Sequence, residues 1–128
     1  MPKVLISDKI AADAIAVFED MGVEVDYRPG LPADELLEII HEYDGLAIRS
    51  ATKVTQEVLA NATNLKAVGR AGIGVDNVDV PAATKAGVVV MNTPFGNAVT
   101  TAEHAITMML SLSRLIPQAH MSTIAVRR

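Results

Sequence analysis

Short apolar runs alternate along this chain with segments of helical periodicity, and this alternation constrains the fold more than any other feature. Buried strands are predicted where the runs occur, at residues 4–6, 23–25, 45–48, 65–68 and 88–91. Helical patterns lie between them, over residues 11–21, 34–40, 55–61 and 81–87. Almost continuously apolar strands, each followed by a helix, are typical of a parallel sheet covered on both faces. We therefore predict an α/β fold, a flavodoxin-like doubly wound parallel sheet.

Composition narrows the classes of function. Half of the 128 residues are hydrophobic and only 3% are aromatic, so aliphatic side chains must form the core. The net charge of −4 argues against nucleic acid or an anionic membrane as the main partner. The chain has no cysteine, and no spacing of His, Asp and Glu supports a metal site. No apolar stretch approaches the roughly 18 residues of a membrane span. The sequence predicts a soluble, cytoplasmic protein.

The last predicted helix, residues 99–116, differs from the others because apolar residues cover most of its circumference. A helix of this kind must be buried on several sides. One small sheet cannot supply that burial, so either a further domain or a second subunit is expected to pack against it. The tail, residues 119–128, shows no convincing pattern.

Candidate functional residues follow the predicted strand ends, where ligands bind in parallel sheets. Arg49 ends the third strand, residues 70–74 follow the fourth and residues 92–97 follow the fifth. If these loops converge, Arg49, Lys53 and Arg70 would form a positive pocket for an anionic substrate. Composition alone favours the alternative that Arg49 forms a surface salt bridge.

Glycines crowd the loop after the fourth strand, at Gly69, Gly72 and Gly74. Their spacing does not fit the dinucleotide fingerprint, because the third glycine position holds Asn77. A tight turn with positive φ and a loop whose backbone amides bind an anion remain equally plausible from the residues alone.

The polar residues near the last helix have ordinary structural interpretations. Asn97 suits a turn or a helix cap. Glu103 and His104 are adjacent in a helix and so do not share a face, which makes them a poor acid–base pair. From the residues alone, no catalytic group is assigned.

Three segments together carry a resemblance to a known family: Ile48-Arg49-Ser50-Ala51-Thr52-Lys53-Val54-Thr55, residues 70–79, and Met91-Asn92-Thr93-Pro94. With Asn97 and Thr101-Ala102-Glu103-His104 they resemble the D-2-hydroxyacid dehydrogenases, and the likeness runs from about residue 3 to about residue 118. It implies a substrate-binding domain over residues 1–97. It also implies a linking and dimerisation helix over 98–118 that leads into a Rossmann nucleotide-binding domain, and leaves 119–128 as a divergent tail.

The resemblance also implies an activity, the NAD-dependent oxidation of a small anionic 2-hydroxy acid. Arg49 and Ser50 would hold the anionic groups of the substrate, and backbone amides of Gly72, Ile73 and Gly74 would meet its carboxylate. The remaining assignments are Asn97 beside the reacting carbon, and Ile73 and Thr101 at the nicotinamide end of the cofactor.

In relatives, the glycine fingerprint, the active-site arginine and the Glu–His pair lie downstream of the last residue of this sequence. The expectation is therefore a truncated chain, inactive alone, that forms a homo-oligomer through the helix at 99–116. Two alternatives are a free-standing flavodoxin-like binding module and a non-catalytic dimerisation partner. The first is disfavoured because strand one offers only Asp8 as an acid and strand three ends in Arg49.

Overall fold

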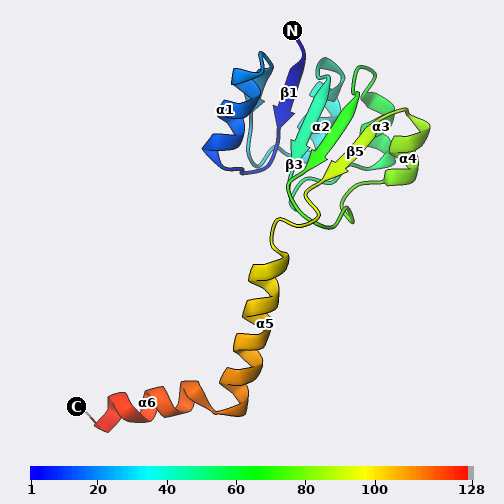
Figure 1. The fold of residues 1–128 in the computed structure, drawn as a ribbon. Coiled ribbons are helices and arrows are strands. Elements are labelled where there is room, and N and C mark those ends of the chain that lie inside the picture. Colours follow the sequence, from blue (N-terminus) through cyan, green and yellow to red (C-terminus); the bar gives the residue numbers. More distant parts are fainter. Residues whose placement is uncertain (127–128) are drawn as a thin grey trace. The chain divides into compact units, whose positions relative to one another are not determined.

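A computed structural model describes residues 1–126, which fall into two compact units that divide between Gly96 and Asn97 (Figure 1). The strands of the first unit are β1 Lys3–Ile6, β2 Glu24–Tyr27, β3 Gly45–Ile48, β4 Ala67–Arg70 and β5 Val89–Asn92. Its helices are α1 Ala12–Asp20, α2 Ala33–Ile39, the 3-10 turn η1 Ile40–Glu42, α3 Gln56–Asn61 and α4 Val80–Lys85. The second unit contains α5 Ala98–Ser113 and α6 Ile116–Val126.

All five strands form one parallel sheet in the order β2-β1-β3-β4-β5. This is the strand order of flavodoxin-like folds, so the predicted α/β class is confirmed. In this order the carboxyl ends of β1, β3, β4 and β5 lie side by side at one edge. The residues that follow those strands are therefore neighbours in space.

The hydrophobic core lies on the face of the sheet that α2, α3 and α4 cover. Alternate residues of the central strands point into it, and the helices add one apolar side chain or more each. Its least exposed members, all at 2% or less, are Leu5, Leu36, Ile40, Tyr43, Leu46, Ile48, Val54, Val68 and Ala83. The core is aliphatic except for Tyr43, whose hydroxyl donates a 2.6 Å hydrogen bond to Asp26.

The opposite face carries fewer helices of the first unit, although both faces carry at least one, as expected for a doubly wound sheet. Only α1 packs on it, beside β2, and no residue of that helix is buried. Val89 and Met91, on β5, remain 58% and 53% exposed. The helical patterns were placed correctly, but three of the four helices pack on the same face.

The strand β3 has the predicted bounds, whereas the other four strands differ from the predicted ones by one or two residues, and β4 differs most. It begins at Ala67, not Leu65, because the Leu65 amide donates to the Ala62 carbonyl in the preceding turn. The strand therefore extends to Arg70, which pairs with Ile48 of β3. Arg70 is thus a strand residue, not the first residue of a loop.

Two helix ends carry residues that are typical of these positions. The Asp79 side chain caps α4 by accepting from the Ala82 amide at 3.0 Å, as its position before Pro81 indicates. Gly22, after α1, has a φ of +73°, a left-handed conformation that glycine adopts without strain.

The second unit corrects two expectations. The helix predicted over 99–116 ends at Ser113, where Leu115 adopts a φ of +50°. Residues 116–126, which include the described part of the tail, form a separate helix, α6, although its apolar residues mark no single face. Neither α5 nor α6 contains a buried residue. No helix of the described residues is long and apolar enough to cross a membrane.

Candidate functional site

The loops that follow β3, β4 and β5 are joined by hydrogen bonds at the carboxyl edge of the sheet. The Ala71 amide donates to the Ile48 carbonyl at 2.8 Å, and the Thr93 amide donates to the Gly72 carbonyl at 2.9 Å. The predicted convergence of these loops is therefore observed.

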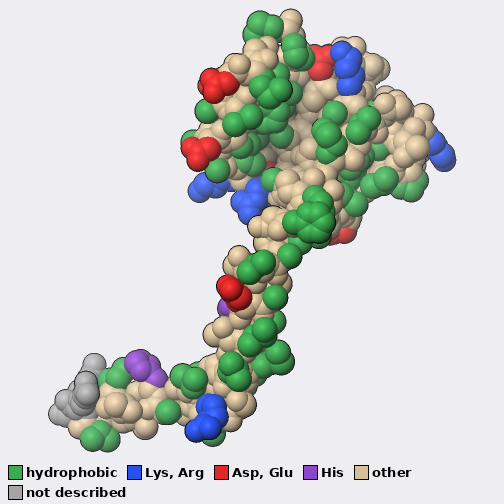
Figure 2. Space-filling view, viewed as in Figure 1, with side chains coloured by type: hydrophobic (Ala, Val, Ile, Leu, Met, Phe, Trp, Pro, Cys, Tyr) green, Lys and Arg blue, Asp and Glu red, His purple; other side chains and the backbone are tan. Residues whose placement is uncertain are grey.

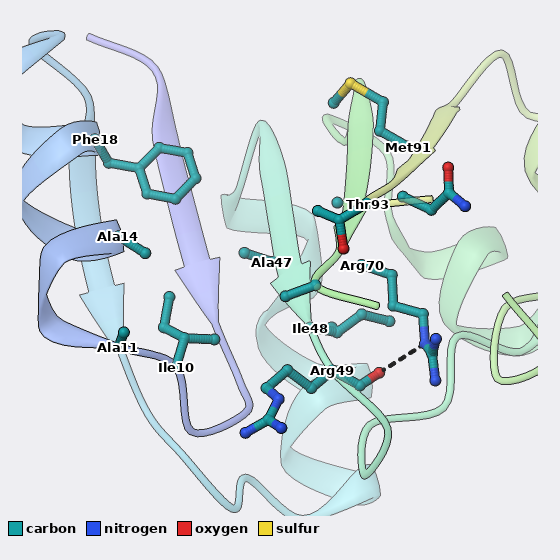
Figure 3. Close-up of a pocket in the computed structure, with 13 residues that line it drawn as sticks. Ile10, Ala11, Ala14, Phe18, Ala47, Ile48, Arg49, Arg70, Met91 and Thr93 are labelled. Carbon is teal, nitrogen blue, oxygen red and sulfur yellow. Dashed lines mark hydrogen bonds between the residues drawn. The ribbon is translucent and has the colours of Figure 1, made fainter. Parts of the chain in front are cut away.

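A groove of 520 Å³ opens beside these loops, on the less covered face of the sheet (Figure 3). Its walls come from α1 on one side and from β3, β4 and β5 on the other. Its lining is mostly apolar, with the two arginines at its edge. The labelled lining residues are Ile10, Ala11, Ala14, Phe18, Ala47, Ile48, Arg49, Arg70, Met91 and Thr93.

The loop after β3 is organised around the carboxylate of Asp8. Asp8 is only 4% exposed and lies two residues after the end of β1. One oxygen accepts from the Arg49 amide at 2.6 Å and from the amides of Ala51 and Thr52 at 3.2 Å. The other accepts from the Thr52 hydroxyl at 2.7 Å and from the Thr52 amide at 3.1 Å. Asp8 therefore determines the conformation of residues 49–52.

These contacts settle the charge state of Asp8. Burial by itself raises the pKa of this carboxyl, but the hydrogen bonds from the Thr52 hydroxyl and the loop amides outweigh it and lower the pKa below its ordinary value. Asp8 is therefore a buried anion held by hydrogen-bond donors.

Arg70 has a structural role in the glycine loop. Its guanidinium donates to the carbonyls of Arg49, at 3.2 Å, and Gly74, and its side chain is only 12% exposed. It therefore orients the two loops relative to each other. Lys53 does not line the groove, whereas Arg49 does and is exposed there, so the predicted pocket of three cations stays a prediction.

Crowding accounts for the glycine at position 72 of this loop, but not for Gly69, where a Cβ would meet no atom within 4 Å. Neither Gly72 nor Gly74 has a positive φ, so a turn that requires one is not the reason for glycine. A Cβ at Gly72 would lie 2.6 Å from an Arg70 nitrogen, and one at Gly74 would lie 2.9 Å from an Asp76 oxygen. Glycine at position 72 therefore leaves room for the buried arginine.

Some backbone amides of these loops donate no hydrogen bond within the protein and could therefore bind a ligand. The Gly72 amide donates to the Arg70 carbonyl, so it is already occupied. Within residues 1–126, the amides of Ser50, Ile73 and Gly74 donate to no acceptor of the chain. These residues are exposed, as is the Arg49 side chain, whose guanidinium donates to the Lys9 carbonyl at 3.1 Å.

Three polar residues of the site were missed from the sequence: Asp8, Asn77 and Asn92. The Asn77 amide group donates at 2.7 Å to the carbonyls of both Arg49 and Thr52, and Asn92 donates at 2.7 Å to the Ile73 carbonyl. Asp8 lies two residues after β1 and Asn92 is the last residue of β5, and this position near a strand end was the available signal. No local pattern singles out Asn77.

Two further predicted residues belong to the second unit. Asn97 is the N-cap residue of α5, but its side chain makes no capping hydrogen bond, while its carbonyl accepts from the Thr101 amide at 2.9 Å. Their roles at a substrate or cofactor remain predictions. Among residues 1–126, no three His, Asp or Glu side chains are grouped so that they could hold a metal ion.

Comparison with known proteins places this arrangement in a family. The profile of the D-isomer specific 2-hydroxyacid dehydrogenase catalytic domain matches residues 4–127. A D-3-phosphoglycerate dehydrogenase of Synechocystis sp. is 48% identical over 122 residues, which are 95% of this chain and 22% of that protein. One of Mycobacterium tuberculosis is 50% identical over 95% of this chain and 23% of its own length. The chain thus spans under a quarter of these relatives.

Solved structures agree with the sequence matches. The NAD⁺-bound 3-phosphoglycerate dehydrogenase of Entamoeba histolytica superposes with a TM-score of 0.75 at 31% identity, over 86% of this chain and 38% of that one. The TT0316 protein of Thermus thermophilus gives a TM-score of 0.83 at 28% identity, over 91% of this chain and 38% of its own. The chain therefore belongs to the family of D-isomer specific 2-hydroxyacid dehydrogenases.

Proposed function

We propose that this chain is the substrate-binding part of an NAD-dependent D-3-phosphoglycerate dehydrogenase, which oxidises 3-phosphoglycerate to 3-phosphohydroxypyruvate for L-serine biosynthesis. In this proposal residues 1–97 are the substrate-binding domain, 98–118 link it to a nucleotide-binding domain, and 119–128 are a divergent tail. The relatives that carry this name, at 48% and 50% identity, support the choice within the family. The predicted cytoplasmic location stays a prediction.

One observation of the structure carries the proposal: an exposed arginine and three unused backbone amides at the same edge of the sheet. The guanidinium of Arg49 suits a carboxylate or a phosphate, because it offers parallel donors with a permanent charge. The amides of Ser50, Ile73 and Gly74 add uncharged donors that are already oriented by the loops. Together they would bind the two anionic groups of a phosphorylated 2-hydroxy acid.

NAD would supply the hydride acceptor when it is bound. The Ile73 side chain is 43% exposed beside the unused amides, and such an apolar surface would suit the flat nicotinamide ring. In our proposal Ile73 and Thr101 border that ring and Asn97 borders the reacting carbon. The group that accepts the hydroxyl proton is not assigned to any residue of this chain.

An amide NMR titration of the chain with 3-phosphoglycerate tests the proposal. We expect shifts concentrated at Ser50, Ile73 and Gly74, and a dissociation constant that rises about 10–100-fold in Arg49→Ala, the loss of one charged hydrogen-bonding group. Arg28→Ala is the matched control, because Arg28 is an exposed arginine that pairs with Asp26 instead. Equal affinity of the two variants would show that Arg49 does not bind the substrate.

A second function, dimerisation, is favoured by the exposed apolar residues of the second unit. Met109, Leu110 and Leu112 of α5 are 59–69% exposed, and Figure 2 shows hydrophobic side chains spread along this helix. We propose that they form a contact between copies of the protein. Sedimentation velocity checks this: Leu112→Lys should shift the chain toward the monomer, whereas Ser122→Lys on α6 should not. A wild-type monomer at every concentration would exclude it.

A further inference from the structure

Asp8 is the feature of the site that neither the sequence motifs nor the proposed substrate contacts account for. A buried carboxylate without a cationic partner is costly unless hydrogen bonds replace its water shell. Here five contacts do so, and all five come from residues 49–52. No basic side chain forms a salt bridge with Asp8 among the described residues. The energetic coupling is therefore between this carboxylate and one loop.

The pattern of contacts leaves one amide of the loop out. The amides of Arg49, Ala51 and Thr52 turn toward Asp8, whereas that of Ser50 does not. From the other side, the Arg49 carbonyl accepts from both Arg70 and Asn77, so it is also held inside the protein. The loop is thus held through three of its amides and through the Arg49 carbonyl. Among the amides of residues 49–52, that of Ser50 is the donor that remains for an external anion.

A hydroxyl relay fixes the direction of these bonds. The Thr52 hydroxyl lies 2.7 Å from Asp8 and 2.8 Å from the hydroxyl of Ser7, which is 1% exposed. Because an ionised carboxylate only accepts, Thr52 donates to Asp8 and Ser7 donates to Thr52. Each buried polar group of the relay has a partner, so the arrangement has one defined set of donors and acceptors.

We propose that Asp8 is a positioning residue, which holds the loop 49–52 so that the Ser50 amide and the Arg49 guanidinium face the anionic substrate. It does not touch the substrate. This inference rests on the proposed function for the identity of the ligand, but not for the conformation of the loop. It opposes a simple electrostatic expectation, in which a negative charge below an anion site would weaken binding.

The test compares Asp8→Asn with Asp26→Asn in the 128-residue chain. Asp26 is the matched control, since its carboxylate also accepts hydrogen bonds from a buried partner, Tyr43, but contacts no residue of the loop. Amide hydrogen exchange, measured without ligand, reports on loop order. We expect the protection of the Arg49 and Thr52 amides to fall about tenfold in Asp8→Asn, equivalent to one hydrogen bond of average strength, and to persist in Asp26→Asn.

Binding of 3-phosphoglycerate is then measured by NMR on the same variants. The dissociation constant should rise about tenfold in Asp8→Asn and remain unchanged in Asp26→Asn. Equal or tighter binding by Asp8→Asn would overturn the proposal, because the electrostatic effect would then dominate. A purely structural role would lower the unfolding midpoint in both variants without a selective change in affinity.

The role of Asp8 can still be tested if the Asp8→Asn variant does not fold or if the wild-type chain does not bind the ligand. If Asp8→Asn does not fold, Thr52→Val removes one of the five hydrogen bonds at nearly constant volume, and its unchanged loop protection would overturn the proposal. If the wild-type chain does not bind 3-phosphoglycerate, the proposed function fails for this chain. The exchange data still decide whether Asp8 orders the loop, since they need no ligand.

Discussion

The two units of this chain have similar proportions of apolar residues but differ in how they bury them. In the first unit, side chains from three helices and four strands pack into a common core, where Leu5, Leu46 and Val68 are at most 1% exposed. In the second, α5 and α6 contain no buried residue, and leucines such as Leu112 are 69% exposed.

The difference shows what apolar content contributes in each region. Burial of apolar area stabilises a fold at about 25 cal/mol per Å², but only when a partner surface exists. The sheet gives α2, α3 and α4 that surface. Contacts within the second unit do not give it to α5, so the same kind of side chain stabilises the first unit and stays exposed in the second.

Leucine truncations should give the largest contrast between the units. Leu46→Ala should lower the free energy of unfolding by about 2–5 kcal/mol, because it leaves a cavity in a closely packed core. In chains diluted until they are monomeric, Leu112→Ala should change it by less than about 0.5 kcal/mol. Urea unfolding followed by circular dichroism measures both values. A cost at Leu112 as large as at Leu46 in the monomer would mean that Leu112 is buried within the chain itself.

The pH dependence of stability should depend on Asp8, which belongs to the first unit. Its pKa is lower in the folded protein than in the unfolded chain, so the unfolded state binds more protons between the two values. The stabilisation from ionised Asp8 is complete above the pKa of this carboxyl in the unfolded chain, about 3.9. It is lost as the pH falls through its lower pKa in the folded protein.

Urea unfolding between about pH 2 and pH 6 measures this contribution. In Asp8→Asn the decline of stability at acid pH should be shallower than in the wild type. Some decline should remain, because the pKa of Asp26 is also lowered: burial raises it, but the hydrogen bonds from Tyr43 and Arg28 outweigh that effect. Superimposable curves for Asp8→Asn and the wild type would contradict the assignment of a buried, ionised Asp8.

Substitutions at the N-cap residues of α4 and α5 should give the smallest difference in stability between the two units. Asp79→Ala removes the side chain that accepts from the Ala82 amide at the start of α4, and should cost about 1 kcal/mol. Asn97→Ala changes the N-cap residue of α5, whose side chain accepts no such bond, and should cost a few tenths at most. Thermal unfolding of both variants checks the order, and a reversed order would mean that Asn97 caps α5 in solution.

Much of the fold was predictable because its signals are local. Apolar runs separated by helical periodicity identified the strands, and the acidic cap at Asp79 and the glycine at position 22 marked helix ends. The boundary of β4 was not predictable, since Leu65 is as apolar as a strand residue but its amide closes a turn. The helical conformation of residues 119–126 was missed for a related reason: the apolar residues of α6 define no face.

For the candidate site, the sequence by itself determined which loops matter, because residues after parallel strands must meet at one edge. It could not separate groups that face a ligand from groups that hold the loops. Only the tertiary structure decided that Arg70 is engaged with the backbone of both loops and that Arg49 remains exposed. The same holds for Asp8, whose partners lie more than forty residues away in the chain. Such assignments depend on which donors and acceptors are already paired, and pairing is a property of contacts between distant segments.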